Sequence, residues 1–245
     1  MIKWLKTKAH KLFNVFGVDV IKLGHFDQEL GKHLSKVFKS REIDRVLDVG
    51  ANSGQYAKYL REIGYTGYIV SFEPVKSAFD QLLINAGNDS KWLCHNLALG
   101  NEAQTQRINV FEDTQFSSFL DASDYSKALW ATTRQSSTEV VAVARLDEVF
   151  DSIKDATGCQ NFYLKLDTQG FDLKVFLGAG ESLRHIHAMQ SELSLISVYD
   201  GMERSFAGFE QYLAAGFFIS GMFPINIEPS LAVIEYDCVL VKRIA

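Results

Sequence analysis

Arg45-Val-Leu-Asp-Val-Gly50-Ala-Asn-Ser-Gly54 is a short apolar run that ends in a glycine-containing loop. A helical pattern follows directly, in which apolar residues recur at three- and four-residue spacing from Tyr56 to Ile63, before Gly64. A glycine just after the last periodic residue is a common helix end. The sequence therefore predicts a strand, a glycine loop and a helix over residues 45–64.

The same alternation continues along the chain. Residues 68–73 form a second apolar run, Pro74 stands at the first turn of a predicted helix, and residues 91–99 form a third run. Strands and helices that alternate at this spacing are typical of βαβ units, which build a parallel sheet with right-handed crossovers.

The second half of the chain is less regular. Strands are predicted at 105–111, 138–144, 162–167, 187–196, 217–223 and 236–242, and helices at 171–177 and 206–215. Because the chain closes on a strand pair after a run of βα units, we expect a seven-stranded, mostly parallel sheet with an antiparallel edge strand. The 245 residues leave room for one such α/β domain and an appendage.

Charge divides the chain into two parts. The net charge is -5, yet residues 1–45 hold ten Lys/Arg and five Asp/Glu. Apolar residues at helical spacing from Ile2 to Phe16 predict a basic amphipathic helix within an N-terminal extension over residues 1–44, followed by a domain over residues 45–245. Such a helix suits peripheral contact with a membrane surface, a partner or a second subunit, or packing on the main domain.

Composition also bears on the expected compartment, metal content and partners of the protein. The sequence has no run of eighteen apolar residues, and its three cysteines are far apart, which favours a reducing cytoplasm. His185 and His187 lack partners for a metal set, so no metal is expected. The acidic remainder of the chain argues against a nucleic-acid partner.

The loop at Gly50 and Gly54 is suited to an anionic ligand group, because glycines allow close backbone approach and the following helix offers free N–H groups. A tight structural turn is the alternative. Glu73 ends the second predicted strand, twenty-three residues after Gly50, where an acidic side chain would accept hydrogen bonds from ribose hydroxyls; it could instead cap the next helix. Loop and acid together favour a ligand that contains adenosine.

Four ordered motifs resemble the FkbM-type S-adenosylmethionine-dependent methyltransferases. They are residues 45–54, Phe72-Glu-Pro74, Asn96-Leu-Ala-Leu99, and residues 162–170 (Phe-Tyr-Leu-Lys-Leu-Asp-Thr-Gln-Gly) with Gly178. The resemblance extends over about residues 45–242. It implies an α/β, Rossmann-like class I methyltransferase fold with helices on both faces of the sheet, and S-adenosyl-L-methionine as the cofactor.

The resemblance also implies roles for single residues. Residues near the first glycine loop would hold the methionine part of the cofactor: Asp48, Gly50, Ala51, Asn52 and Gly54. Glu73 would hold the ribose hydroxyls, and Asn96 to Ala98 would border the adenine. Asn96 is equally well explained as a turn residue that bonds its own backbone.

The reacting centre is expected at the end of the strand over 162–167. Asp167 lies there, as a base or as a group that orients substrate or cofactor. Lys165 and Glu192 fall inside apolar strands, where an unpaired charge is costly, so an ion pair between them is predicted. Asp172 is explained by its place in the first turn of a helix.

These features favour an O-methyltransferase that acts on a hydroxyl of a carbohydrate or glycosylated metabolite, a substrate class that the resemblance supplies. The segment 116–130, with four aromatic residues, is a candidate cap over the acceptor; a surface loop or a dimer contact is the alternative. A non-catalytic binding or assembly protein with this fold is the rival function. A nicotinamide-dependent oxidoreductase is disfavoured, because the glycine spacing is not Gly-x-Gly-x-x-Gly.

Overall fold

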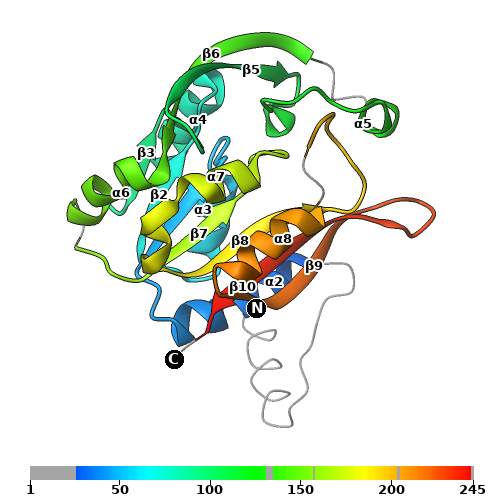
Figure 1. Ribbon diagram of the computed structural model, residues 1–245. Coiled ribbons are helices and arrows are strands. Elements are labelled where there is room, and N and C mark those ends of the chain that lie inside the picture. The colour runs from blue at the N-terminus through cyan, green and yellow to red at the C-terminus, as the bar shows by residue number, and fades with distance from the viewer. Residues whose placement is uncertain (1–25, 131–134, 157, 203–204, 244–245) are drawn as a thin grey trace, which may run out of the picture.

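A seven-stranded sheet forms the centre of the molecule (Figure 1). The computed structural model describes residues 26–130, 135–156, 158–202 and 205–243. Five neighbouring strands run parallel, and β10 runs antiparallel to both β8 and the edge strand β9. The expected sheet is thus confirmed, and its reversed strand lies one place in from the edge. In spatial order the strands are β3 (Trp92–His95), β2 (Tyr68–Phe72), β1 (Arg45–Val49), β7 (Phe162–Leu166), β8 (Ile186–Ser194), β10 (Val233–Lys242) and β9 (Phe217–Ile227).

Helices cover both faces of this sheet (Figure 1). One face packs against α6 (Leu146–Asp155), α7 (Asp172–Gly178) and α8 (Ser205–Ala214). The other packs against α2 (Phe26–Ser40), α3 (Gln55–Glu62) and α4 (Lys76–Ala86). The helix α6 was not predicted, although its Leu146, Phe150 and Ile153 are buried at helical spacing. Strands buried on both faces are mostly apolar, and β1 and β7 follow this pattern apart from Arg45, Asp48 and Lys165. Both strands were therefore visible in the sequence.

The helix α2 falls within the expected N-terminal extension and packs against the sheet. Leu34 is fully buried, and the ring of Phe38 meets the ring of Tyr163 edge-on at 4.9 Å between centroids. His33 Nε2 lies 2.8 Å from Ser220 Oγ on β9. The predicted helix over residues 2–16 lies outside the described residues. Within the described part of the chain, no helix combines the length and the apolar character needed to cross a membrane.

A second, three-stranded sheet stands beside β3 and has the order β4 (Ala98–Gly100), β6 (Gln135–Arg145), β5 (Gln104–Phe111). The run predicted as one strand over 91–99 therefore divides between the two sheets, because the chain turns between His95 and Ala98. Gly178 lies against β4 so closely that a Cβ atom there would stand 1.8 Å from the Gly100 carbonyl oxygen. The second sheet is thus fixed against α7.

The chain between β5 and β6 returns toward the main sheet. It contains a 3-10 turn, η1 (Thr114–Phe116), and the short helix α5 (Asp124–Leu129). Another 3-10 turn, η3 (Gly180–His185), leads into β8. Residues 113–119, here called the roof, lie over the ends of the parallel strands and line the cavity described next.

Candidate active site

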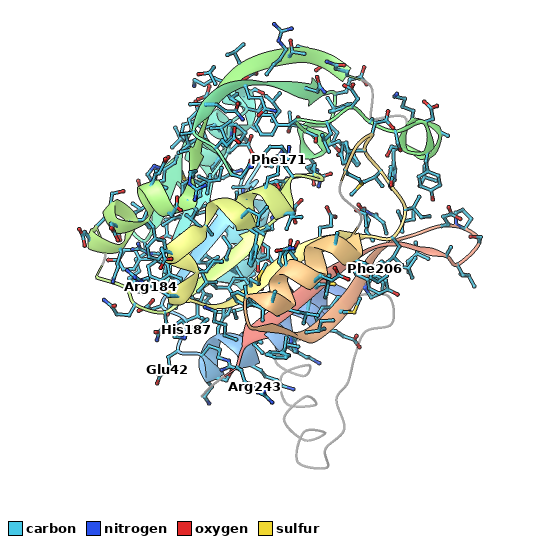
Figure 2. All side chains as sticks on the ribbon, viewed as in Figure 1. Glu42, Phe171, Arg184, His187, Phe206 and Arg243 are labelled. Atoms are coloured by element: carbon cyan, nitrogen blue, oxygen red, sulfur yellow. The ribbon has the colours of Figure 1, made fainter. Side chains whose placement is uncertain are left out.

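A cavity of about 680 Å³ opens where the parallel strands end. Its walls come from the loops after β1, β2 and β7, from β8 and β10, and from the roof. Phe171, just beyond β7, marks this end of the sheet in Figure 2, whereas Glu42, His187 and Arg243 gather at the opposite end. Ligands of open α/β sheets bind at the carboxyl ends of strands, so the cavity lies where the fold predicts a site.

Gly50 is required by geometry. Its φ is +77°, and a Cβ atom at this position would stand 1.9 Å from the Asp167 carbonyl oxygen. The backbone N–H groups of Gly50 and Ala51 both donate to the Phe72 carbonyl, at 3.1 and 3.0 Å. The loop therefore lies tight against the ends of β2 and β7, and Gly50, Ala51 and Asn52 line the cavity.

Gly54 and Asp48, by contrast, pack against other residues and do not face the cavity. Gly54 is the N-cap of α3 with φ +87°, and a Cβ atom there would stand 2.6 Å from the Trp92 ring. Asp48 is fully buried within β1. Neither is among the described residues that line the cavity.

Glu73 is buried at the end of β2 and faces the cavity. Its Oε2 accepts from the Asn52 N–H and its Oε1 from the Val75 N–H, each at 2.8 Å. It therefore accepts a backbone N–H at the start of α4, as the capping alternative predicts. A carboxylate offers about four acceptor sites, so Glu73 still has free lone pairs. Burial raises the pKa of Glu73 to about 7.

Asn96 takes neither of its two expected places. Its amide Nδ2 donates to the carbonyls of Glu73 and Pro74, both at 2.9 Å, and its side chain stays outside the lining of the cavity. Ala98 does line the cavity, together with Leu97 and Leu99. These three residues give that wall an apolar character suited to the face of a flat ring.

Lys165 lies between two carboxylates. Its Nζ is 3.6 Å from Asp48 Oδ1 and 2.9 Å from Asp167 Oδ2, and its side chain is only 6% exposed. Asp48 Oδ2 accepts from Ser71 Oγ, while Oδ1 makes no hydrogen bond within the described residues. Burial alone would lower the pKa of Lys165, but the Asp167 and Asp48 carboxylates outweigh it and raise the pKa.

The predicted ion pair between Lys165 and Glu192 is wrong. The strands β7 and β8 are neighbours, as assumed, but their register places Lys165 opposite Gln190. On its other side Lys165 stands opposite Asp48 of β1, which takes the ion pair instead. Glu192 lies beyond the end of β7, where its Oε2 accepts from Gln169 Nε2 at 3.2 Å.

Glu192 belongs to an acidic end of the cavity. Asp237 of β10 stands directly opposite it in the strand pair, and Glu235 lies two residues away on the same strand. Burial, followed by the charges of Glu235, Asp167, Asp237 and Asp172, raises the pKa of Glu192 well above its usual range. Burial also raises the pKa of Asp237 to about 6.

Asp172 has a structural role. Its Oδ1 accepts from the N–H and the hydroxyl of Thr168, at 2.8 and 2.6 Å, and its Oδ2 accepts from Ser191 Oγ at 2.8 Å. These bonds fix the loop after β7 to β8. They leave Asp167 and Glu192, rather than Asp172, on the lining of the cavity.

The roof contributes two of the four aromatic residues expected to cap an acceptor. Phe116 and Phe119 line the cavity, whereas Tyr125 and Trp130 pack in a separate cluster with Tyr199 and Ile234. The roof is attached to the glycine loop by a hydrogen bond of 2.9 Å from Asn52 Nδ2 to Thr114 Oγ1.

Sequence reasoning missed several residues of the cavity, among them Tyr56, Gln169, Gln190, Glu235 and Asp237. Asp237 carried a usable signal, because a carboxylate inside an apolar strand needs an explanation just as Lys165 did. Gln169 carried none, since its place depends on the backbone of the loop. In the described ranges, no three His, Cys, Asp or Glu side chains are grouped to hold a metal ion.

This arrangement defines a class of protein. A parallel sheet with a reversed strand next to its edge, a glycine loop after the first strand and an acid after the second form the Rossmann-like methyltransferase fold. The chain belongs to the FkbM methyltransferase-domain family, whose model matches residues 48–218. It is therefore an S-adenosylmethionine-dependent methyltransferase.

Solved structures give only distant likenesses. A putative O-methyltransferase from Klebsiella pneumoniae is 10% identical with a TM-score of 0.45, over 97% of this chain and 89% of that one. Fibrillarin from Aeropyrum pernix, solved with natively bound S-adenosyl-L-methionine, is 14% identical with a TM-score of 0.45, over 81% and 66%. A Streptococcus agalactiae protein of the NADB-Rossmann superfamily is 12% identical with a TM-score of 0.46, over 91% and 69%.

At these TM-scores none of the three bears on what this chain binds. No curated protein matches the chain.

Proposed function

We propose that the protein transfers the methyl group of S-adenosylmethionine to a hydroxyl of a carbohydrate or glycosylated acceptor. One observation carries the proposal. A single cavity joins the glycine loop and Glu73 at one side to Lys165, Asp167 and Glu192 at the other. A cofactor and an acceptor can thus meet at the end of β7.

The residues present fit the cofactor. The loop at Gly50 leaves no room for a side chain, so backbone there can approach a ligand closely. Glu73 keeps acceptor capacity for the two ribose hydroxyls, and Ala98 lies on an apolar wall suited to the adenine. When bound, S-adenosylmethionine supplies an electrophilic methyl group on a sulfonium sulfur.

The two carboxylates at the reacting end have different partners. Asp167 accepts from Lys165 at one oxygen and from Gln169 at the other, so it is held in a fixed orientation. Glu192 accepts one hydrogen bond, from Gln169, and stands among other carboxylates. A hydroxyl oxygen that gains a methyl group must lose its proton. We assign Glu192 to receive that proton and Asp167 to orient the reactants.

The acceptor class is supported by the lining of the cavity. Lys165 is the one cation among its described residues, against six carboxylates. Carboxylates are acceptors of hydrogen bonds, which suits a ligand rich in hydroxyl donors. The rings of Phe116 and Phe119 offer apolar faces for the sugar ring. A screen of sugar-containing extracts with a labelled methyl donor would identify the acceptor.

Cofactor binding tests the assignment most directly. We expect calorimetry to detect S-adenosylmethionine binding to the wild type and none to Glu73→Ala, because the ribose would lose its acceptor. The affinity should also fall about tenfold from pH 8 to pH 6, since Glu73 with a pKa of about 7 gains a proton over that range. In Glu73→Gln this pH dependence should vanish. A wild type that binds no cofactor would refute the proposed function.

Two isosteric variants separate the roles of the carboxylates. We expect Glu192→Gln to keep cofactor affinity and to lower methyl transfer by about 100-fold or more, because general base catalysis contributes roughly this factor. In the wild type the rate should fall as the pH drops below the pKa of Glu192, since only the ionised carboxylate accepts a proton. Asp167→Asn should retain that acid limb at a lower rate. If Asp167→Asn instead abolishes the acid limb, the assignment of the base is reversed.

A further inference from the structure

Gln169 adopts a backbone conformation that is unusual for its residue type. Its φ is +52°, in the left-handed region, and the next residue is Gly170 with φ +88°. A non-glycine residue in this region costs of order 1–3 kcal/mol and persists only where its surroundings hold it. Glycine would fit both positions without that cost. The side chain of Gln169 therefore needs an explanation.

Three side-chain hydrogen bonds supply the explanation, and a fourth bond is made by the backbone. Gln169 Nε2 donates to Asp167 Oδ1 at 2.8 Å and to Glu192 Oε2 at 3.2 Å. Its Oε1 accepts from the Tyr199 hydroxyl at 2.6 Å. Its backbone carbonyl accepts from Ser118 Oγ of the roof at 2.7 Å.

These bonds also fix which way the amide points. The Tyr199 hydroxyl stands next to Oε1, and it lies 3.0 Å from the Phe116 carbonyl, which also belongs to the roof. Burial raises the pKa of Tyr199, so its hydroxyl keeps its proton and remains a donor. With Oε1 engaged by that donor, both Nε2 hydrogens are left for the two carboxylates.

We propose that Gln169 is a positioning residue that holds Asp167 and Glu192 side by side in the cavity and connects them to the roof. Its contribution to catalysis rests on the proposed function. A neutral amide is suited to this place, because it donates to two carboxylates at once and adds no charge. It thus keeps the orienting carboxylate and the proton acceptor at one separation while the roof stays in place above them.

Several charged groups share the surroundings of Glu192 and bear on any titration. Asp167 lies at the end of β7, Asp172 in α7, and Glu235 and Asp237 on β10, and all four raise the pKa of Glu192. These groups remain in place when Gln169 is replaced, so a change in the Glu192 titration reports the loss of the amide.

Gln169→Gly is the informative variant, because it removes the side chain and the backbone strain together and so should fold. We expect carbon NMR of the labelled carboxyls, with the Glu192 signal assigned by Glu192→Gln, to show the Glu192 midpoint raised by about one pH unit, the effect of a lost charge-assisted hydrogen bond. Tyr199→Phe, which frees the amide to turn over, should give a smaller rise. Hydrogen exchange in the roof should quicken in Tyr199→Phe, because the hydroxyl beside the Phe116 carbonyl is lost.

Glu42→Gly is the matched control. Glu42 also has a positive φ, of 51°, but lies at the opposite end of the sheet (Figure 2). Its replacement should relieve the same kind of strain and leave the Glu192 titration and the roof unchanged.

A Glu192 midpoint in Gln169→Gly that stays within a few tenths of the wild-type value would overturn the proposal. These readouts need neither cofactor nor acceptor, so they stand even if the wild type binds no S-adenosylmethionine. Where an acceptor is known, Gln169→Gly should lower kcat and shift the acid limb of its pH profile, with KM for S-adenosylmethionine nearly unchanged.

Discussion

Gly50→Ala is expected to abolish S-adenosylmethionine binding while the protein still folds. The added Cβ atom would stand 1.9 Å from the Asp167 carbonyl oxygen, a distance that no pair of non-bonded atoms tolerates. Both neighbours are backbone, so the loop after β1 must move away from the end of β7. A misplacement of about 1 Å costs on the order of 100-fold in catalytic rate, and we expect calorimetry to detect no S-adenosylmethionine binding to this variant.

Gly64→Ala is a control for the cost of placing alanine at a positive φ. Gly64 has φ +93°, but a Cβ atom there would meet nothing within 4 Å. Both substitutions carry the left-handed penalty of roughly 1–3 kcal/mol in the free energy of unfolding. Only Gly50→Ala carries the collision as well. Equal loss of cofactor affinity in the two variants would show that general destabilisation, rather than the shape of the loop, accounts for the result.

Lys165→Met is expected to be the most destabilising single change at the site. It removes the cation beside Asp48, which is fully buried. Breaking a buried pair by removing one partner costs about 3–5 kcal/mol, because a charge is left uncompensated. Asp167 loses the same partner, but it is 39% exposed and can be hydrated. Chemical denaturation at pH 8 should reveal the loss.

The destabilisation should depend on pH with a definite sign. Burial raises the pKa of Asp48 above its ordinary value of 3.8 even with Lys165 present, and removing the lysine raises it further. Between the unfolded and the folded pKa the folded state binds more protons, so stability falls as the pH rises. Lys165→Met should thus be closest to the wild type near pH 4 and furthest from it at pH 8.

A double variant completes this test. Adding Asp48→Asn to Lys165→Met removes the stranded charge and keeps a side chain that can bond Ser71. It should recover most of the stability at pH 8 without recovering methyl transfer, since Asp167 still lacks its ion pair. Recovery of both would mean that Lys165 serves stability alone.

Much of the fold was predictable because its signals are local. The apolar runs of β1 and β7 are buried on both faces of the sheet, and Gly50 and Gly54 both have the positive φ that glycine allows. The division into two sheets was not predictable, since Ala98 continues the run that begins at Trp92. The chain turns between the two residues, and this turn places β3 and β4 in different sheets. Local sequence does not encode that turn.

A site residue was predictable where its position at the end of a strand places it at the cavity. Glu73 was placed at the cavity by its position after β2. The partner of Lys165 was not predictable in this way. That Lys165 lies in a buried strand shows only that it needs a partner, and the strand register decides whether the partner is Asp48 or Glu192. Gln169 was missed for a related reason, since its role depends on a loop conformation and on Tyr199, thirty residues away.

Because β10 runs against β8, it begins at the cavity and so brings Glu235 and Asp237 there, although both come late in the chain. The wall from Gly50 to Ala98, which we propose holds the cofactor, lies entirely within the first hundred residues. The wall from β8 and β10, which we propose faces the acceptor, comes from roughly the last sixty residues. Exchange of the later segment by recombination would therefore change the proposed acceptor wall and leave the proposed cofactor wall intact.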